Sequence, residues 1–186
     1  MSNETEIKKG SLLIAEPFMW DPNFKRTVTL ICENEENTGA FGFVLNRPME
    51  MKLHETINGI KKFSAPLYYG GPVELDTLHF LHTLKDLDDA VEICEGLYWG
   101  GNFEALKIII NSGKVSPNDF RFFLGYSGWE AGQLKEEMKE KSWIIHQVKP
   151  AHLFKMNAAE LWKIVLQELG GEYKQMINFP EDPTYN

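Results

Sequence analysis

Short runs in which apolar and polar residues alternate predict strands along much of the chain. Over residues 27–32, threonines alternate with apolar neighbours and β-branched residues are frequent, a pattern typical of a half-buried strand. The acidic turn at 33–38 leads into an apolar run over 40–45, so the two runs predict an antiparallel hairpin. Further strands are expected over 11–15, 67–71, 78–81, 91–94, 97–99, 120–126 and 143–148.

Three stretches have the spacing of amphipathic helices, and a short helix is expected over 53–60. The three stretches span 103–110, 129–141 and 157–169. Asn102 and Asn157 stand where side chains cap the first and the last of these helices. In the middle helix Glu137 precedes Lys141 by four residues, the favourable order for an ion pair. Strands and helices in this irregular order predict an α+β fold.

Composition limits the class of protein further. The chain has 186 residues, of which 43% are hydrophobic and 25% charged, as in soluble globular domains. Since no linker divides it, we expect a single domain over 1–186, with mobile tails at 1–9 and 178–186. We find neither a signal peptide nor an apolar run near the ~20 residues of a membrane span. Cys32 and Cys94, distant in sequence and without a nearby second thiol, are expected to be reduced core residues of a cytoplasmic protein.

Charge argues against nucleic acid as a partner. Nineteen Lys and Arg against 27 Asp and Glu give a net charge of −8, which repels polyphosphates at long range. The expected helix over 129–141 mixes lysines with glutamates, as a solvated helix face does. We therefore expect an unidentified protein partner or a small ligand, and no direct binding of nucleic acid.

Two groupings suggest chemistry but have simpler explanations. Residues 125–129 lie between a strand and a helix, where hydrolases place a nucleophilic serine, but Trp129 stands where that motif needs its second glycine. Ser127 is therefore expected to cap the helix. His79 and His82 could chelate a metal on a helix, but on a strand they point to opposite faces. We expect no catalytic residue, no metal site and no cofactor.

Loops at strand ends carry the remaining candidate site. An arginine beside glycine-rich turns and a helix N-terminus can hold an anion through exposed N–H groups and charge. The loops are Asn46-Arg47-Pro48, Gly70-Gly71-Pro72 and Gly100-Gly101-Asn102. A pocket for an anion or a small metabolite would bring together Asn46, Arg47, Gly70, Gly71, Ser127, Trp129 and Gln133. The alternative is that these glycines only serve turns and that Arg47 pairs with a carboxylate.

Six ordered motifs give the chain a recognisable pattern. They are GSLLIA at 10–15, RTVTLIC at 26–32, GFVLNRP at 42–48, YGGPV at 69–73, LYWGGNFE at 97–104, and FLGYSGW at 123–129 followed by AGQL at 131–134. In these motifs the chain resembles the AlgH/YqgE family of bacterial proteins.

The resemblance implies an α+β fold in which a bifurcated, largely antiparallel sheet curls into a pseudo-barrel with flanking helices, in a cytosolic bacterial protein. The family's usual label is transcriptional regulator, and the family offers no established catalytic residues to carry over. Glu130 stands where the family commonly has a small residue, which adds negative charge beside the 125–129 loop. The leading expectation is a non-enzymatic regulatory or binding protein. The alternative is a small-molecule or anion-binding sensor, or an enzyme, with its pocket at the Asn46-Arg47 and 125–129 loops.

Overall fold

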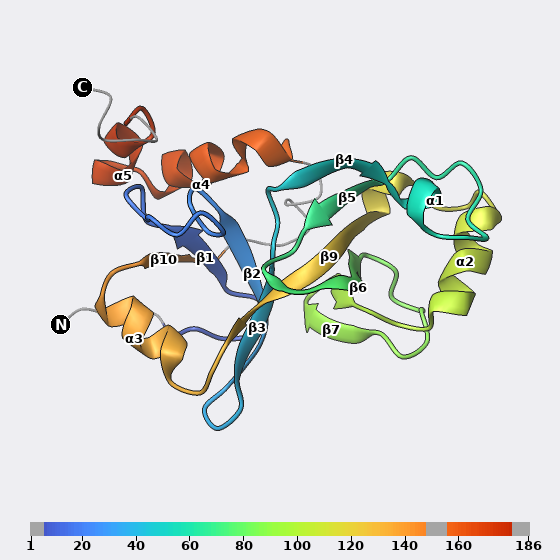
Figure 1. Cartoon of the computed structure of the whole chain (residues 1–186), viewed down its shortest axis with the longest axis horizontal. Helices are drawn as coiled ribbons and strands as arrows, with labels where there is room; N and C mark the ends of the chain where they lie inside the picture. Colours follow the sequence, from blue (N-terminus) through green and yellow to red (C-terminus); the bar gives the residue numbers. More distant parts are fainter. Residues whose placement is uncertain (1–5, 148–155, 180–186) are drawn as a thin grey trace.

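The computed structural model describes residues 6–147 and 156–179, which form a mixed structure of strands and helices (Figure 1). The strands are β1 (Leu12–Ala15), β2 (Val28–Glu35), β3 (Gly39–Val44), β4 (Pro48–Lys52), β5 (Pro66–Tyr69), β6 (Val73–His82), β7 (Val91–Cys94), β8 (Leu97–Trp99), β9 (Phe120–Trp129) and β10 (Trp143–His146). The helices are α1 (Leu53–Thr56), α2 (Phe103–Asn111), α3 (Gln133–Lys139), α4 (Leu161–Leu169) and α5 (Gly171–Met176), with short 3-10 helices η1 (Pro117–Asp119) and η3 (Ala158–Glu160).

One long strand, β9, joins two halves of the sheet. The strand order is β10-β1-β2-β3-β9-β6-β8-β7, and β5, with β4 beside it, also pairs with β9. The C-terminal part of β9 pairs with β3, whereas its N-terminal part pairs antiparallel with β6 and parallel with β5. Within the described residues the sheet is therefore bifurcated, largely antiparallel and not closed. The expected α+β fold is confirmed.

Gly125 lies where β9 leaves one half of the sheet for the other. Its φ is +68°, in the left-handed region that favours glycine. A Cβ at this position would lie 2.7 Å from the carbonyl oxygens of both Gly71 and Val73, so the backbone at the start of β6 leaves no room for a side chain. Opposite this point the pairing register of β6 shifts between Val73 and Leu78. The fork in the sheet thus depends on a glycine with a left-handed backbone.

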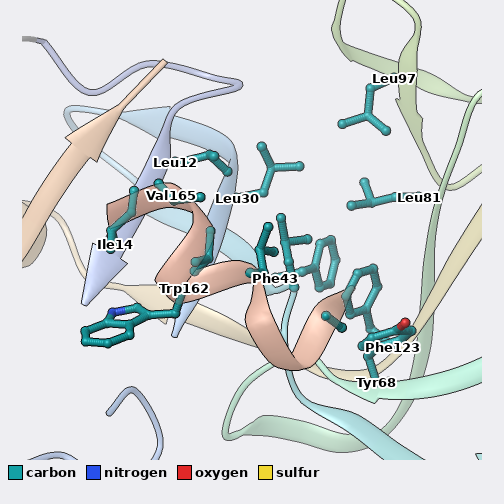
Figure 2. Close-up of a cluster of buried hydrophobic side chains, with 14 of the residues drawn as sticks. Leu12, Ile14, Leu30, Phe43, Tyr68, Leu81, Leu97, Phe123, Trp162 and Val165 are labelled. Atoms are coloured by element: carbon teal, nitrogen blue, oxygen red, sulfur yellow. The ribbon is translucent and has the colours of Figure 1, made fainter. Parts of the chain in front are cut away.

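Helices cover different parts of the branched sheet. In Figure 1, α4 and α5 lie beside β1 and β2, whereas α1 and α2 lie at the opposite end of the molecule. Figure 2 shows Trp162 and Val165 of α4 beside Ile14 of β1, in the largest core cluster. A second cluster joins α1 and α2 to β5, β6 and β9, and a third joins α3 to β1, β3 and β10. Burial of these apolar stripes, rather than helix propensity, positions the helices.

Side-chain caps begin two helical segments as expected. The Asn102 side chain accepts a hydrogen bond from the backbone N–H of Ala105 at 3.0 Å, and Gly113, with a φ of +70°, follows the end of α2. The Asn157 side chain accepts from the N–H of Ala159 at 3.1 Å and opens η3, which leads into α4.

The helix expected over 129–141 begins later than the sequence suggested. Trp129 is the last residue of β9, and α3 starts only at Gln133. Ser127 is therefore a strand residue and not a helix cap, and Gly128 is paired in β9 opposite Phe41. The prediction of a turn here was wrong because glycine usually interrupts strands, whereas Gly128 continues β9, where an added Cβ would lie 3.3 Å from the Tyr126 ring.

Three further differences concern elements near prolines and glycines. Strand β4, beginning at Pro48, was not expected, since proline is usual only at strand ends and sheet edges; here it opens an outer strand. The helix expected over 53–60 is a single turn, α1. Gly170, with a φ of +68°, ends α4 as expected, but the chain continues at once into α5.

The two cysteines are closer in space than their separation in sequence suggested. Both are free, and the Cys94 side chain packs against the cluster that contains Cys32. Burial raises the pKa of the Cys32 thiol far above its ordinary value, and the neighbouring Cys94 raises it further. The fold thus brings two thiols that are distant in sequence to the same core, where β2 and β7 meet.

Parts of three expectations lie outside the described residues: the end of the strand over 143–148 and most of the tails at 1–9 and 178–186. Within the described part, Ile7 packs against the third core cluster. The Phe179 ring stacks on that of Phe18, with ring centroids 5.5 Å apart.

Candidate functional site

Asn46 and Arg47 hold a neighbouring loop in place. The Asn46 side chain accepts from the backbone N–H of Val28 and donates to the carbonyl of Arg26, each at 2.9 Å. The Arg47 guanidinium donates to the carbonyl of Lys25 at 2.8 Å. Within the described part of the chain, Arg47 therefore binds backbone carbonyls of this loop rather than a carboxylate, the alternative that the sequence left open.

Gly70, Gly71 and Ser127 form the contact between the end of β5 and β9. The Ser127 hydroxyl is fully buried and donates to the Gly70 carbonyl at 3.0 Å. A Cβ on Gly70 would lie 2.2 Å from the carbonyl oxygen of Gly125, and one on Gly71 would lie 2.3 Å from that of Tyr126. The two glycines allow the two backbones to approach closely, and the Gly70 carbonyl gives the buried Ser127 hydroxyl a hydrogen-bond partner.

Trp129 and Gln133 meet at Glu137 of α3. Glu137 accepts from the Trp129 indole through Oε2 at 2.9 Å and from the Gln133 amide through Oε1 at 2.9 Å. The Trp143 indole donates to the same Oε2 at 2.7 Å. The described residues contain no ion pair between Glu137 and Lys141, because Glu137 faces the two indoles.

The seven candidate residues thus make three separate sets of structural contacts. None of the seven lines the cavity beside β6, β8 and α2 or the cavity at the N-terminal ends of β5 and β9. A ligand at these residues stays a prediction, and the structure directs attention to other parts of the surface.

A cavity of about 370 Å³, here called the aromatic cavity, lies where β6, β8 and the start of α2 meet. Its lining is mainly apolar and contains several rings. The lining residues are Ile57, Leu78, His79, Phe80, Trp99, Gly100, Gly101 and Phe103. Among these described residues His79 alone carries a titratable side chain, so the lining offers ring surface and one imidazole but no carboxylate, hydroxyl or thiol.

The glycine turn at 100–101 shapes one wall of the aromatic cavity. Gly100 and Gly101 have φ values of +69° and +120°, which let β8 turn sharply into α2. The Gly100 N–H donates to the Phe80 carbonyl at 2.9 Å, and its carbonyl oxygen lies 2.8 Å from Nε2 of His82. This turn is one of the strand-end loops that the sequence analysis named as candidate binding loops. The Phe80 carbonyl and the His82 ring, both of β6, hold it in place.

His79 and His82 lie on opposite faces of β6, as expected for a strand. His82 is fully buried against the Tyr98 ring, with centroids 5.7 Å apart, whereas His79 lines the cavity. The His79 ring lies 5.2 Å from that of Phe43, and its Nε2 is 3.1 Å from the Thr77 hydroxyl.

Burial lowers the pKa of both histidines. For His79 the nearby Glu74 carboxylate opposes this effect only in part. Since the ordinary pKa of histidine is about 6.5, both imidazoles are uncharged at neutral pH. The described residues contain no group of three or more His, Cys, Asp or Glu side chains able to hold a metal ion.

Sequence reasoning singled out the Gly100-Gly101 turn and His79, the latter as a candidate metal ligand, and did not single out the other lining residues. The Gly100-Gly101 turn and the following cap gave a local signal. Ile57, Leu78 and Phe103 gave none, because they look like ordinary core residues until distant segments come together.

No helix within the described ranges has the length and apolarity needed to cross a membrane.

Nearly the whole length of the chain is similar to known proteins. The model of the AlgH-like family (DUF179) matches residues 12–174. A UPF0301 protein of Chlorobaculum tepidum is 47% identical over 188 residues, an alignment that covers 100% of both chains. A UPF0301 protein of Cytophaga hutchinsonii is 41% identical over 182 residues, which covers 97% of this chain and 100% of the relative.

Two solved structures share the fold. The solution structure of the AlgH protein from Pseudomonas aeruginosa has a TM-score of 0.74 at 30% identity, covering 97% of this chain and 98% of that one. The crystal structure of protein DIP2367 from Corynebacterium diphtheriae has a TM-score of 0.75 at 22% identity, covering 94% and 93% of the two chains. The sequence motifs, the branched sheet and these matches agree, and the chain belongs to the AlgH-like family.

Proposed function

We propose that this protein is a non-enzymatic, cytoplasmic regulatory protein that binds a small, uncharged ligand with a flat ring in the aromatic cavity. The observation that carries the proposal is the lining itself: half-buried Trp99 and Phe103, with uncharged His79, around a space of about 370 Å³. Apolar cavities with a few convergent polar groups are where small molecules usually bind.

The size of the cavity sets the size of the ligand. Ligand sites commonly enclose roughly 300–1,000 Å³. A dry cavity of about 150 Å³ accepts benzene, so a space of about 370 Å³ has room for a ring system somewhat larger than one ring.

The lining also selects the type of ligand. Trp99 and Phe103 present ring surface, and an offset aromatic contact contributes about 0.5–1.5 kcal/mol beyond area burial. No lysine or arginine is among the lining residues, and the chain carries a net charge of −8. Lys107, whose ammonium lies 5.7 Å from the Phe103 ring centroid, is paired with Glu104 at 2.6 Å. An anionic ligand would have to compete with this carboxylate for Lys107, which favours an uncharged ring.

His79 supplies orientation rather than catalysis. One ring nitrogen lies beside the Thr77 hydroxyl, which fixes the ring. The other can exchange a single hydrogen bond with a ligand. Because the same ring contacts Phe43 of the main core, occupancy of the cavity has a path to the centre of the sheet.

Two further observations support the cellular setting of the proposal. Both described cysteines are free thiols, as in reducing compartments. The negative net charge favours regulation through a ligand or a protein partner over direct contact with DNA.

Calorimetric titration of the full chain with indole, an uncharged ring, and with benzoate, a charged one, tests the proposal. We expect saturable binding of indole and weaker binding of benzoate. Phe103→Ala should weaken indole binding, whereas Ile108→Ala, on the exposed face of the same helix, should not. Equal affinities of the two variants, or no binding of indole, would rule out this site.

A further inference from the structure

Four side-chain rings from four different strands form a closed circle of contacts. They are Phe41 of β3, His79 of β6, Trp99 of β8 and Tyr126 of β9, here called the ring cluster. The ring centroids are 4.9 Å apart from Phe41 to Trp99 and 6.4 Å apart from Trp99 to His79. They are 5.8 Å apart from His79 to Tyr126 and 6.3 Å apart from Tyr126 back to Phe41. Each ring of the cluster thus contacts two others.

The ring cluster lies at the surface of the protein. Its four side chains are half-buried, whereas the Phe43 ring, which contacts Phe41 and His79, is fully buried in the main core. Gly128, opposite Phe41 in the sheet, is exposed, and a Cβ there would lie 3.3 Å from Cε2 of Tyr126. Glycine at this position therefore leaves room beside the Tyr126 ring.

Carboxylates lie beside two members of the ring cluster. Glu33 of β2 is the register partner of Phe41, and directly opposite residues of an antiparallel pair share a face of the sheet. Burial lowers the pKa of His79, and the nearby Glu74 carboxylate opposes this effect only in part, so the imidazole is uncharged at neutral pH. Both glutamates are exposed. Together with the net charge of −8, they favour a cation at these rings.

From this geometry we propose that the ring cluster binds the methylated ammonium group of a small organic cation. The face of an aromatic ring is negative and attracts a cation that lies within about 6 Å of its centroid. The short distances between neighbouring centroids let one such group approach more than one ring at once. A methylated ammonium suits these rings better than a bare ammonium does, because its methyl groups pack on ring surface whereas a bare ammonium is strongly hydrated.

This inference goes beyond the proposed function. Trp99 and His79 belong both to the ring cluster and to the lining of the aromatic cavity, whereas Phe41 and Tyr126 belong to the ring cluster alone. The two proposals also concern different ligands, an uncharged ring and an organic cation. Separate titrations with indole and with a methylated ammonium ion can therefore fail or succeed independently.

NMR of the backbone amides and indole N–H groups, with the full chain titrated by tetramethylammonium chloride, tests the proposal. Sodium chloride at equal ionic strength controls for general salt effects. The uncharged compound tert-butanol, similar in shape to the cation, controls for apolar binding. We expect saturable shifts of the Trp99 indole N–H and of the amides of the ring cluster, with tert-butanol at least about tenfold weaker. Shifts no larger than those with sodium chloride, or equal affinity for tert-butanol, would overturn the proposal.

Variants show whether the rings themselves hold the cation. Phe41→Leu keeps an apolar side chain but removes the ring face, and it should weaken tetramethylammonium binding about tenfold. Phe41→Tyr keeps the ring and should restore binding. Phe18→Leu removes a ring that is 46% exposed elsewhere on the surface and should have no effect. Equal affinities of Phe41→Leu and Phe18→Leu would contradict the assignment. If Phe41→Leu does not fold, the comparison with tert-butanol decides.

Discussion

Trp129 and Trp143 donate their indole N–H groups to one carboxylate oxygen of Glu137, at 2.9 and 2.7 Å. The two indoles come from β9 and β10, and the carboxylate comes from α3. Both tryptophans are 4% exposed, and their rings lie 6.0 Å apart in an edge arrangement. Glu137 thus fastens α3 to two strands that do not pair with each other.

Replacement of Glu137 by alanine should therefore destabilise the fold. It leaves two buried indole donors without their acceptor, at a cost of about 3 kcal/mol in the free energy of unfolding. Glu136→Ala, on the exposed side of the same helix, removes only a surface ion pair with Lys139 and should cost less than about 1 kcal/mol. Urea unfolding measures both, and similar losses would show that Glu137 has no special role.

Gly125→Ala tests the fork in the sheet. Gly125 and Gly96 both have left-handed φ values, +68° and +77°. A Cβ would meet two carbonyl oxygens at Gly125 and nothing within 4 Å at Gly96. Gly96→Ala should cost about 1 kcal/mol for its backbone alone, and Gly125→Ala should cost clearly more. Thermal unfolding of the two variants makes the comparison, and equal losses would show that the close approach at Gly125 is relieved without cost.

The fork also shows which parts of the fold the sequence could predict. Local signals placed the hairpin over 27–45 and the Asn102 cap correctly, because turn residues and caps act within a few positions. They failed at Gly125, where the backbone of Gly71 and Val73 approaches from a segment distant in sequence, and at Gly128, which is paired within β9. The same limit applies to the candidate site, since Phe103 becomes a cavity residue only when α2 reaches β6.

Acid should destabilise the protein through His79 and His82. Burial lowers the pKa of both imidazoles in the folded state. In the unfolded chain the same imidazoles take up a proton at about pH 6.5, a pH at which they are still uncharged in the folded protein. Their contribution is present above this pH and is lost as the pH falls toward the folded pKa. NMR titration of the imidazole rings should show both titrating below the ordinary value. Titration of either at or above that value would contradict the assigned burial effect.

Alkali should destabilise the protein through its thiols. Burial raises the pKa of Cys94 to about 11 and that of Cys32 further, whereas the unfolded thiols titrate near about 8.5. The contribution of these thiols to the free energy of unfolding is therefore fully present below about pH 8.5. The part that Cys94 supplies is lost as the pH rises from there through about 11. Unfolding measured across this range, with Cys94→Ser as the control, should show a smaller decline in the variant. An unchanged decline would rule out Cys94 as its source.

The aromatic cavity is the central claim, and nuclear Overhauser contacts between bound indole and the protein test it most directly. We predict contacts from the indole ring protons to the side chains of Trp99 and Phe103 and to the amide of Gly101. Contacts confined to exposed surface rings such as Trp20, which is 77% exposed, would contradict the account, as would their absence at saturating indole.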